Sequence, residues 1–400
     1  MGRYIIIGDG VAGARAAVKI READPKGEIH LFTEEPFPFY YRVRFPELIV
    51  GEVSISDLII HSKEFYERRE ILLHLEEKIT GGDPRKREVK SEKERSYSYD
   101  SLLLATGGRA FIPSIKGVEK RGVFALRSMK DAVDFKEYLT GIRKAILIGG
   151  GLVGLETGGA LIRHGIQVAV VEHNPRILPK QMDPEGARIL QEKMEGMGFS
   201  FFLNARSEEI LGREKAEGLR LEDGRTVEGD MVILSAGVRP NIDLAVRMGL
   251  ETRNGVMVND RMETRTDAVF AAGDLAEHRG CCYGIWPAAQ RQGEVAGTNM
   301  AGGNAVYEGT TVSNTLKIVG IDLTSAGEID AEGKYECVVR SDREKCTYCK
   351  VAFMEDKIVG CILLGDSKEK KEILLAIEGK VPIKALRGSM LDKGFDFKKL

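Results

Sequence analysis

Two glycine-rich motifs with the spacing G-x-G-x-x-G are the part of the sequence with the clearest chemical meaning. They are Gly8-Asp9-Gly10-Val11-Ala12-Gly13 and Gly149-Gly150-Gly151-Leu152-Val153-Gly154. In such a motif the first glycine permits a sharp turn, the second lets the backbone approach a pyrophosphate, and the third lets a helix pack closely on a strand. The N-terminus of that helix adds N–H groups and partial positive charge. The two motifs therefore predict two dinucleotide-binding sites in one chain.

A carboxylate follows each motif at the distance that dinucleotide binding requires. In a dinucleotide-binding unit, an acidic residue about 20 residues further on holds the adenosine ribose hydroxyls. Glu34, with Glu35 next to it, takes this place after the first motif, and Glu172 takes it after the second. A single G-x-G-x-x-G is as often an ordinary strand-to-helix turn, but two copies with this context disfavour that interpretation.

The residues after Glu172 bear on which nicotinamide nucleotide the second site would take. An arginine beside the ribose-binding position accommodates the 2′-phosphate of NADPH. Residues 173–175 include no arginine or lysine, and Arg176 is the first cation. The sequence therefore favours NADH over NADPH. For Arg176, a role in phosphate selection and a place as a solvated turn residue are equal alternatives.

Short apolar segments that alternate with helical patterns must position these motifs. Helices are expected at 12–23 and 152–164, each between two strands. This alternation is typical of βαβ units and parallel sheets, so we expect an α/β fold with two doubly wound, Rossmann-like domains. The expected buried strands are 4–7, 28–32, 101–105, 145–148, 167–171, 231–234 and 268–271.

Composition and charge exclude several classes of protein. The 59 basic and 61 acidic residues give a net charge of −2, which leaves no overall positive field for nucleic acid or anionic lipid. The apolar segment after Gly2 and Arg3 is too short for a secretory signal, and the stretch 145–162 contains Glu156 and several glycines, so it is a poor membrane span. Six cysteines do not form a secreted disulfide framework. We expect a globular cytoplasmic protein without membrane or nucleic-acid partners.

Three further segments resemble a known family. Leu102-Leu103-Leu104-Ala105-Thr106-Gly107 resembles the A-T-G segment of flavoproteins with two dinucleotide sites, and residues 266–274, ending in Asp274, resemble their second FAD motif. Residues 235–241, with Ala236 and Gly237, resemble the strand end that closes over NAD. The chain is similar to the FAD-dependent pyridine nucleotide-disulfide oxidoreductase superfamily. That resemblance implies FAD at the first site and NADH at the second, and it assigns Ile79, Arg42 and Asp274 to FAD.

The segment 38–47 indicates the branch of this superfamily. Disulfide reductases carry cysteines in this region, whereas this chain has no cysteine before Cys281. A thiolate relay at this position is therefore excluded. The segment resembles that of NADH:rubredoxin oxidoreductases and, more loosely, that of the flavin module of assimilatory nitrite reductases. Glu47 stands where oxygenase-coupled ferredoxin reductases have lysine, which disfavours that branch.

The resemblance also suggests which side chains act in hydride transfer. Glu156 follows the second motif on the first helical turn and would face the nicotinamide, and we expect Arg42 or Arg44 to pair with it near the flavin. The alternative is that Glu156 only favours the helix N-terminus electrostatically. Trp286, the only tryptophan, lies in a segment that resembles one reaching the flavin's pyrimidine end at a helix N-terminus. The alternative is that Trp286 is a core residue without contact to the flavin.

The remaining cysteines suggest no metal centre. Cys346 and Cys349 form a C-x-x-C, with Cys337 and Cys361 nearby in sequence, but one such pair lacks the second half of a zinc or iron knuckle. Residues three apart on a strand face opposite sides, and the surroundings read as strands around a turn at 355–357. We expect ordinary strand cysteines.

These expectations combine into a domain plan and a function. The FAD-binding domain would comprise 1–112 and 237–305, the NAD-binding domain 113–236, and a C-terminal α/β domain 306–400, with a hairpin and a helix at 367–378. The chain would pass hydride from NADH to FAD and then electrons to a small carrier such as rubredoxin, as a monomer or homodimer. Alternatives are an NADH oxidase, a nitrite-reductase-type flavin module with another acceptor, or an NADH-sensing binding module.

Overall fold

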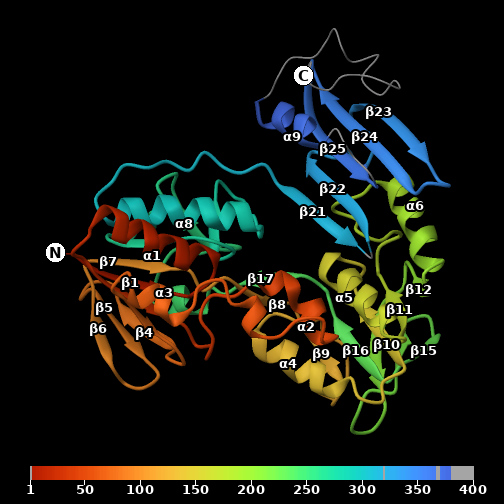
Figure 1. The fold of residues 1–400 in the computed structure, drawn as a ribbon, viewed down its shortest axis with the longest axis horizontal. Coiled ribbons are helices and arrows are strands. Elements are labelled where there is room, and N and C mark those ends of the chain that lie inside the picture. Colours follow the sequence, from red (N-terminus) through yellow and green to blue (C-terminus); the bar gives the residue numbers. More distant parts are fainter. Residues whose placement is uncertain (1, 319, 366–369, 380–400) are drawn as a thin grey trace. The chain divides into compact units, whose positions relative to one another are not determined.

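The computed structural model describes residues 2–318, 320–365 and 370–379, and the chain forms two compact units (Figure 1). The first unit comprises Met1–Arg109, Arg127–Lys130 and Val238–Thr310. The second unit comprises Ala110–Leu126, Asp131–Gly237 and Thr311–Leu400. Each unit is therefore assembled from segments that are distant in sequence.

The first unit is built on a parallel sheet of five strands in the order β19-β7-β1-β2-β3. Its central strands are almost entirely buried apolar residues, as expected when helices or other layers cover both faces of a parallel sheet. The strands are β1 (Arg3–Ile7), β2 (Glu28–Phe32), β3 (Ile71–His74), β7 (Ser101–Leu104) and β19 (Val269–Ala271).

Two long helices pack against each other on this sheet, namely α1 (Val11–Ala23) and α8 (Trp286–Met300), which lie side by side in Figure 1. Their contact is close because α8 presents Gly293 and Gly297 to α1. A Cβ at Gly293 would overlap the backbone of Ala12, and one at Gly297 would overlap the backbone of Ala16. The glycines of α8 therefore fix the position of the helix that starts at the first glycine motif.

The remaining elements of the first unit are short. An antiparallel sheet of three strands, β4-β5-β6, includes the charge-rich stretch 83–95. These elements are β4 (Ile79–Asp83), β5 (Glu88–Ser91), β6 (Ser96–Ser98), β8 (Gly108–Ala110), β17 (Val238–Pro240), β18 (Val256–Val258), β20 (Ala276–His278), η1 (Arg42–Arg44), η2 (Ser56–Leu58), α2 (Phe45–Ile49), α3 (Lys63–Glu67) and α7 (Asp243–Arg247).

The second unit contains another parallel sheet, in the order β12-β11-β10-β16-β9. Its interior strands are again continuous apolar runs. Its elements are β9 (Val123–Phe124), α4 (Met129–Tyr138, which begins in the first unit), β10 (Lys144–Ile148), α5 (Leu152–Arg163), β11 (Gln167–Val171), α6 (Pro184–Glu195), β12 (Phe199–Phe202) and β16 (Met231–Leu234). A small antiparallel sheet lies between β12 and β16 in the sequence and consists of β13 (Ser207–Leu211), β14 (Gly218–Leu221) and β15 (Thr226–Glu228).

The C-terminal part of the second unit is an antiparallel sheet in the order β21-β22-β25-β24-β23. Helix α9 (Lys370–Gly379) packs on β25 and β22, and α6 contacts β24 and β25. The strands are β21 (Ser313–Ile318), β22 (Ile321–Gly327), β23 (Glu336–Asp342), β24 (Thr347–Met354) and β25 (Lys357–Leu364). The expected hairpin is β24 and β25, and the expected helix 367–378 is α9, with 367–369 outside the described residues.

The α/β fold class with two parallel, doubly wound sheets is confirmed. The three-domain plan stays a prediction, because the contact pattern groups the second parallel sheet and the C-terminal sheet in one unit. Among the described residues, no helix is both long enough and apolar enough to span a membrane.

Candidate functional site

The first glycine motif lies at the carboxyl end of β1, where the sheet order reverses between β1 and β7. Ligands of open α/β sheets bind at this switch point. Gly8 has φ +115°, and a Cβ there would overlap the carbonyl oxygen of Ala105; a Cβ at Gly13 would overlap that of Gly8. Gly10, which precedes α1, has open space where a Cβ would be. The loop is thus closed at two glycines and open at the one that a pyrophosphate would approach.

The second motif repeats this geometry at the carboxyl end of β10, at the switch point between β10 and β16. Gly149 has φ +106°, and a Cβ there would overlap the carbonyl oxygen of Ser235. A Cβ at Gly154 would lie 2.8 Å from the Ser235 hydroxyl. At Gly151 the nearest atom would be 3.8 Å away, so this loop is also open at its second glycine. Both loops fit a dinucleotide pyrophosphate.

Other residues expected near the motifs lie at the same sheet edges. Val11 and Ala12 begin α1, and Leu152 and Val153 begin α5, with Val153 largely exposed. Ala236 and Gly237 follow β16 at the surface, and Gly237 has φ +106° with open space at its Cβ position. The backbone next to the second motif is therefore exposed to solvent at Val153, Ala236 and Gly237.

Glu172 lies directly after β11 and is only 4% exposed. Its Oε2 accepts a hydrogen bond from the Gly150 N–H at 2.7 Å, and its Oε1 accepts from the backbone N–H of Asn174 at 2.8 Å and from its Nδ2 at 2.7 Å. An ionised carboxylate has about four acceptor sites, so Oε2 keeps capacity for a ribose hydroxyl. The Arg176 guanidinium donates to the carbonyl oxygens of Met182 at 3.1 Å and Pro179 at 3.2 Å.

The two acidic residues after β2 have different environments. Glu34 is exposed and forms an ion pair with Lys78. Glu35 accepts hydrogen bonds from the Tyr40 hydroxyl at 2.8 Å and from the Met129 N–H at 3.2 Å. Glu34 is therefore the more available for a ribose, whereas Glu35 holds the segment 38–47. Sequence position alone could not separate these two roles.

Asp274 and the end of β7 lie at the same edge of the first sheet. The Asp274 carboxylate pairs with the Arg127 guanidinium at 2.7 Å, and Arg127 also donates to the carbonyl oxygen of Gly108 at 2.7 Å. The Thr106 hydroxyl donates to the carbonyl oxygen of Asn241 at 3.0 Å, and Gly107 has φ +63°. The sequence analysis did not identify Arg127, because this residue belongs to no recognisable motif. It reaches Asp274 only because the short segment Arg127–Lys130 folds back into the first unit.

Asp9, within the first motif, is a second residue that sequence reasoning missed. Its carboxylate accepts a hydrogen bond from the Tyr66 hydroxyl at 2.6 Å and another from the Phe39 N–H at 2.9 Å. Burial raises the pKa of Asp9 to about 7, although both hydrogen bonds oppose this rise. Asp9 thus ties the first glycine loop to the segment 38–47.

The expected helix N-terminus at Trp286 is confirmed, because α8 begins there. Trp286 is half-buried and contacts two aromatic rings of the segment 38–47: its ring centroid lies 5.6 Å from that of Phe39 and 5.1 Å from that of Tyr41. Ile79, in contrast, is a buried residue of the core beneath the sheet. Any contact of Ile79 with a cofactor stays a prediction.

The two arginines of the segment 38–47 differ in their partners. Arg44 forms an ion pair with Glu47, with N–O distances of 2.6 Å and 2.9 Å. The Arg42 guanidinium lies over the Tyr40 ring, 5.5 Å from its centroid. Glu47, noted above as the residue that replaces a lysine, therefore engages Arg44 and leaves Arg42 as the better candidate for the cofactor.

Glu156 lies early in α5, as expected. Burial raises its pKa to about 7, which places its titration near neutral pH. The expected pairing with Arg42 or Arg44 stays a prediction.

All six cysteines are free. Burial raises the pKa of Cys337 to about 11 and that of Cys361 to about 12, which keeps both thiols protonated and unreactive. Cys346 lies in a turn with φ +51° before β24, so the strand interpretation was wrong for this residue. Within the described ranges, no group of three or more His, Cys, Asp or Glu residues is placed to hold a metal ion.

Comparison with known proteins identifies the family. Residues 2–293 match the pyridine nucleotide-disulphide oxidoreductase family, and residues 313–381 match the C-terminal domain of rubredoxin NAD+ reductase. The chain therefore belongs to the pyridine nucleotide-disulphide oxidoreductase family. Its relatives include NADH-rubredoxin oxidoreductases and nitrite reductases, which confirms the branch expected from residues 38–47.

Three relatives and one solved structure illustrate this placement. The chain is 34% identical over 383 residues to a nitrite reductase of Bacillus subtilis, covering 95% of this chain and 48% of that protein. It is 34% identical to an NADH oxidase of Methanocaldococcus jannaschii (93% and 89% covered) and 32% identical to an NADH-rubredoxin oxidoreductase of Clostridium acetobutylicum (93% and 94% covered). A ferredoxin reductase from Rhodopseudomonas palustris has the same fold, with a TM-score of 0.91 at 23% identity and 100% and 99% of the chains covered. The chain thus spans about half the length of its nitrite reductase relative.

Proposed function

We propose that this chain is an FAD-dependent NADH oxidoreductase that delivers electrons to a small carrier protein such as rubredoxin. The observation that carries the proposal is the repeated glycine loop. Each copy lies at the switch point of a parallel sheet, and each is open only where a pyrophosphate would approach. The first unit, which we assign to FAD, has no cysteine in the segment 38–47, where the disulfide reductases of the family carry theirs, so a thiol relay from that position is not available.

The residues of the first unit would hold FAD from several sides. The Gly10 backbone would face the pyrophosphate, Glu34 the adenosine ribose, and the Asp274–Arg127 pair the chain between pyrophosphate and flavin. FAD, when bound, supplies the exchange between one hydride and two single electrons. The Trp286 helix N-terminus brings partial positive charge to the same unit, which would favour an anionic ring system.

We assign NADH to the second site. Glu172 lies at the glycine loop with one oxygen able to accept from a ribose hydroxyl, and a 2′-phosphate there would meet a buried carboxylate. Arg176, the cation nearest in sequence, is engaged with backbone carbonyls of its own loop. Both features support NADH over NADPH.

A carrier protein as acceptor is supported by the C-terminal match and by the Clostridium acetobutylicum relative, which is named for rubredoxin. Oxygen is the second candidate, because the Methanocaldococcus jannaschii relative is named an NADH oxidase. We also propose a cytoplasmic location, which six free cysteines support. A monomer or homodimer is the expected state.

A steady-state assay with different acceptors tests the proposal. FAD-loaded protein would be supplied with NADH together with one acceptor at a time: oxidised rubredoxin, a [2Fe–2S] ferredoxin or air. We expect rubredoxin to be reduced fastest. Turnover with air alone would move the assignment to an oxidase. If no acceptor supports turnover while NADH still binds, the proposed enzyme activity is wrong and the NADH-sensing module replaces it.

A further inference from the structure

The loop of residues 172–183, between β11 and α6, joins the second glycine motif to the start of α6. The carbonyl oxygen of Gly150 accepts from the Leu178 N–H at 3.0 Å, and the Gly150 N–H donates to Glu172. The carbonyl oxygen of Leu178 accepts in turn from the Met182 N–H at 2.9 Å. Both polar backbone groups of Gly150 are therefore held by this loop, which ends at Asp183.

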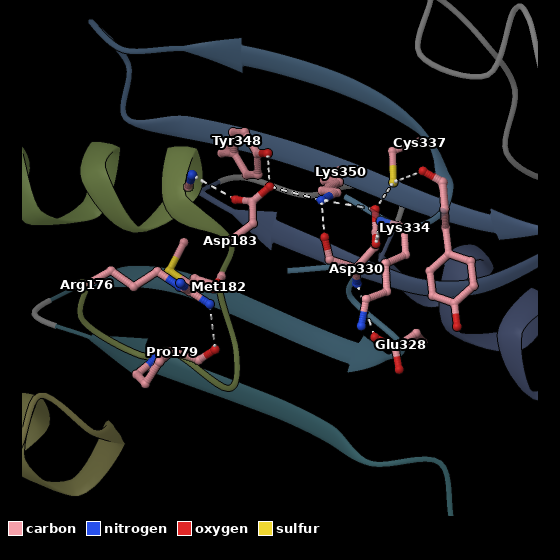
Figure 2. A network of polar contacts seen from close by, with 12 residues as sticks. Arg176, Pro179, Met182, Asp183, Glu328, Asp330, Lys334, Cys337, Tyr348 and Lys350 are labelled. Carbon is pink, nitrogen blue, oxygen red and sulfur yellow. Dashed lines mark hydrogen bonds and ion pairs between the residues drawn. The ribbon is translucent and has the colours of Figure 1, made fainter. Parts of the chain in front are cut away.

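Asp183 is the N-cap of α6, and it is held from the C-terminal sheet (Figure 2). Its Oδ1 accepts from the Gly186 N–H at 3.0 Å, while its Oδ2 accepts from the Tyr348 hydroxyl at 2.7 Å and pairs with the Lys350 Nζ at 3.1 Å. Tyr348 and Lys350 are two residues apart on β24, so their side chains share one face of the sheet. All three side chains are buried, with exposures of 6% for Asp183, 1% for Tyr348 and 6% for Lys350.

Lys350 has a second set of partners, shown in the same view (Figure 2). Its Nζ donates to the carbonyl oxygen of Asp330 at 2.7 Å and lies 3.8 Å from that residue's Oδ2. The Asp330 carboxylate also accepts from the Cys337 thiol at 3.2 Å and from the Lys334 backbone N–H. One buried cation thus joins two buried carboxylates, Asp330 from the connection between β22 and β23 and Asp183 from the loop 172–183. Such a cluster has few alternative arrangements, because moving any member leaves a buried charge unpaired.

We propose that Lys350 and Tyr348 are positioning residues for the pyridine nucleotide: through Asp183 they hold the loop 172–183 against Gly150. This inference rests on the proposed function, because it needs a nucleotide at the second motif. The chain of contacts runs from β24 to Asp183, through Met182 and Leu178 to Gly150, and so to the carboxylate that would bind the ribose. The C-terminal sheet would thereby set the affinity of the second site for the adenosine end of NADH.

Arg176 adds a consequence for specificity. Its guanidinium is held by the carbonyl oxygens of Pro179 and Met182, and Met182 lies directly before Asp183. When Asp183 loses its anchor, the Met182 carbonyl is held less firmly, and the guanidinium, which follows Glu172 by four residues, would be freer to reach a 2′-phosphate. Weakening the anchor should therefore lower the affinity for NADH more than the affinity for NADPH.

Tyr348→Phe tests the proposal most cleanly, because it removes one hydrogen bond to Asp183 and leaves the ion pair with Lys350. Lys350→Met removes the cation and is the stronger but more disruptive variant. Lys345→Met is the matched control, because its exposed ammonium, in the turn before β24, pairs with Asp342 rather than with a member of the network. In the FAD-loaded full chain, calorimetry would measure the dissociation constants of ADP-ribose and of 2′-phospho-ADP-ribose, and stopped-flow absorbance the flavin reduction rate at saturating NADH.

We expect Tyr348→Phe to raise the ADP-ribose dissociation constant about three- to tenfold, with a smaller change for 2′-phospho-ADP-ribose. The control should match the parent chain. FAD content and the saturating reduction rate should stay within about twofold, because no contact of the first unit is altered. An unchanged ADP-ribose dissociation constant in both Tyr348→Phe and Lys350→Met would overturn the positioning role, even if the melting temperature falls. If the parent chain itself binds no ADP-ribose, the proposed function fails instead.

Discussion

At the scale of single residues, Asp9 and Glu156 share an unusual property: burial raises the pKa of each carboxyl to about 7. Asp9 lies in the first glycine motif and Glu156 follows the second. A raised carboxyl pKa means that the folded state binds a proton more readily than the unfolded state. The corresponding stability is fully present at low pH and is lost as pH rises through the folded-state value of about 7.

Glu156→Gln should make the protein more stable above neutral pH. A glutamine carries no charge, so the cost of burying the ionised carboxylate disappears. The gain in the urea midpoint relative to the parent chain should be large at pH 8 and small at pH 5, where Glu156 is already largely protonated. Equal gains at both pH values would contradict the assignment of a near-neutral pKa to this side chain.

The same variant addresses hydride transfer. If the Glu156 charge acts at the nicotinamide, the pH dependence of flavin reduction near pH 7 should flatten in Glu156→Gln, and Glu156→Ala should reduce more slowly with FAD retained. Rapid-mixing absorbance at several pH values measures both. A reduction rate in Glu156→Ala equal to that of the parent chain would leave Glu156 only its effect on the N-terminus of α5.

Asp9→Ala should destabilise the first unit and weaken FAD retention. The substitution leaves the Tyr66 hydroxyl and the Phe39 N–H without their acceptor, and both residues are buried. Each buried donor without a partner costs about 1–3 kcal/mol. Tyr66→Phe is the control, because it removes one donor and keeps Phe39 satisfied. Melting temperatures with and without FAD measure the effect; equal values for Asp9→Ala and Tyr66→Phe would show that the bond to Phe39 adds nothing.

At the scale of elements, the glycine loops separate a packing role from a binding role. Gly13→Ala should disrupt folding of the first unit, because its Cβ would overlap the Gly8 backbone. Gly10→Ala meets no atom, so the apoprotein should fold normally, but the methyl group would occupy the space expected for the pyrophosphate. We expect FAD affinity to fall more than tenfold, equivalent to about 1.4 kcal/mol, in Gly10→Ala.

Gly81→Ala is the matched control for this prediction, since Gly81 lies in β4 and also has open space at its Cβ position. Fluorescence titration of the apoprotein with FAD gives the affinities, and circular dichroism reports folding. FAD affinity in Gly10→Ala equal to that in Gly81→Ala would contradict the placement of the pyrophosphate.

For the strands and helices that carry the motifs, the ends expected from the sequence lie within one residue of the observed ends. Continuous apolar runs such as 28–32 and 167–171 have one interpretation when glycine loops and helical patterns flank them, and both are observed as β2 and β11. Weaker strands such as β9 and β12, and most of the C-terminal sheet, were not anticipated. Their pairing depends on partners that local patterns do not encode.

The candidate site was predicted in part. Spacing identified both glycine loops and Glu172, because binding a dinucleotide fixes distances along the chain. It could not find Arg127 beside Asp274, or Lys350 beside Asp183, because those pairs join distant segments and each side chain alone has an ordinary sequence context. Nor could it show that Glu47 engages Arg44 while Glu35 engages Tyr40.

At the scale of the whole molecule, one chain contains two parallel sheets, each with a glycine loop, and a C-terminal sheet that contacts helices α5 and α6 of the second unit. The family relationship explains the duplication, and the absence of cysteine before Cys281 separates this chain from the family's disulfide reductases. In the function that we propose, electrons from NADH leave from the flavin without a thiol relay at residues 38–47.

Anaerobic stopped-flow absorbance tests the route most directly. FAD-loaded protein would be mixed with NADH or NADPH, and the reduced protein would then be mixed with oxidised rubredoxin or with air. We predict rapid bleaching of the flavin by NADH, slower bleaching by NADPH, and reoxidation that is faster with rubredoxin than with air. Slow bleaching followed by a persistent long-wavelength band, with no reoxidation by rubredoxin, would contradict the account and favour a nucleotide-sensing flavoprotein.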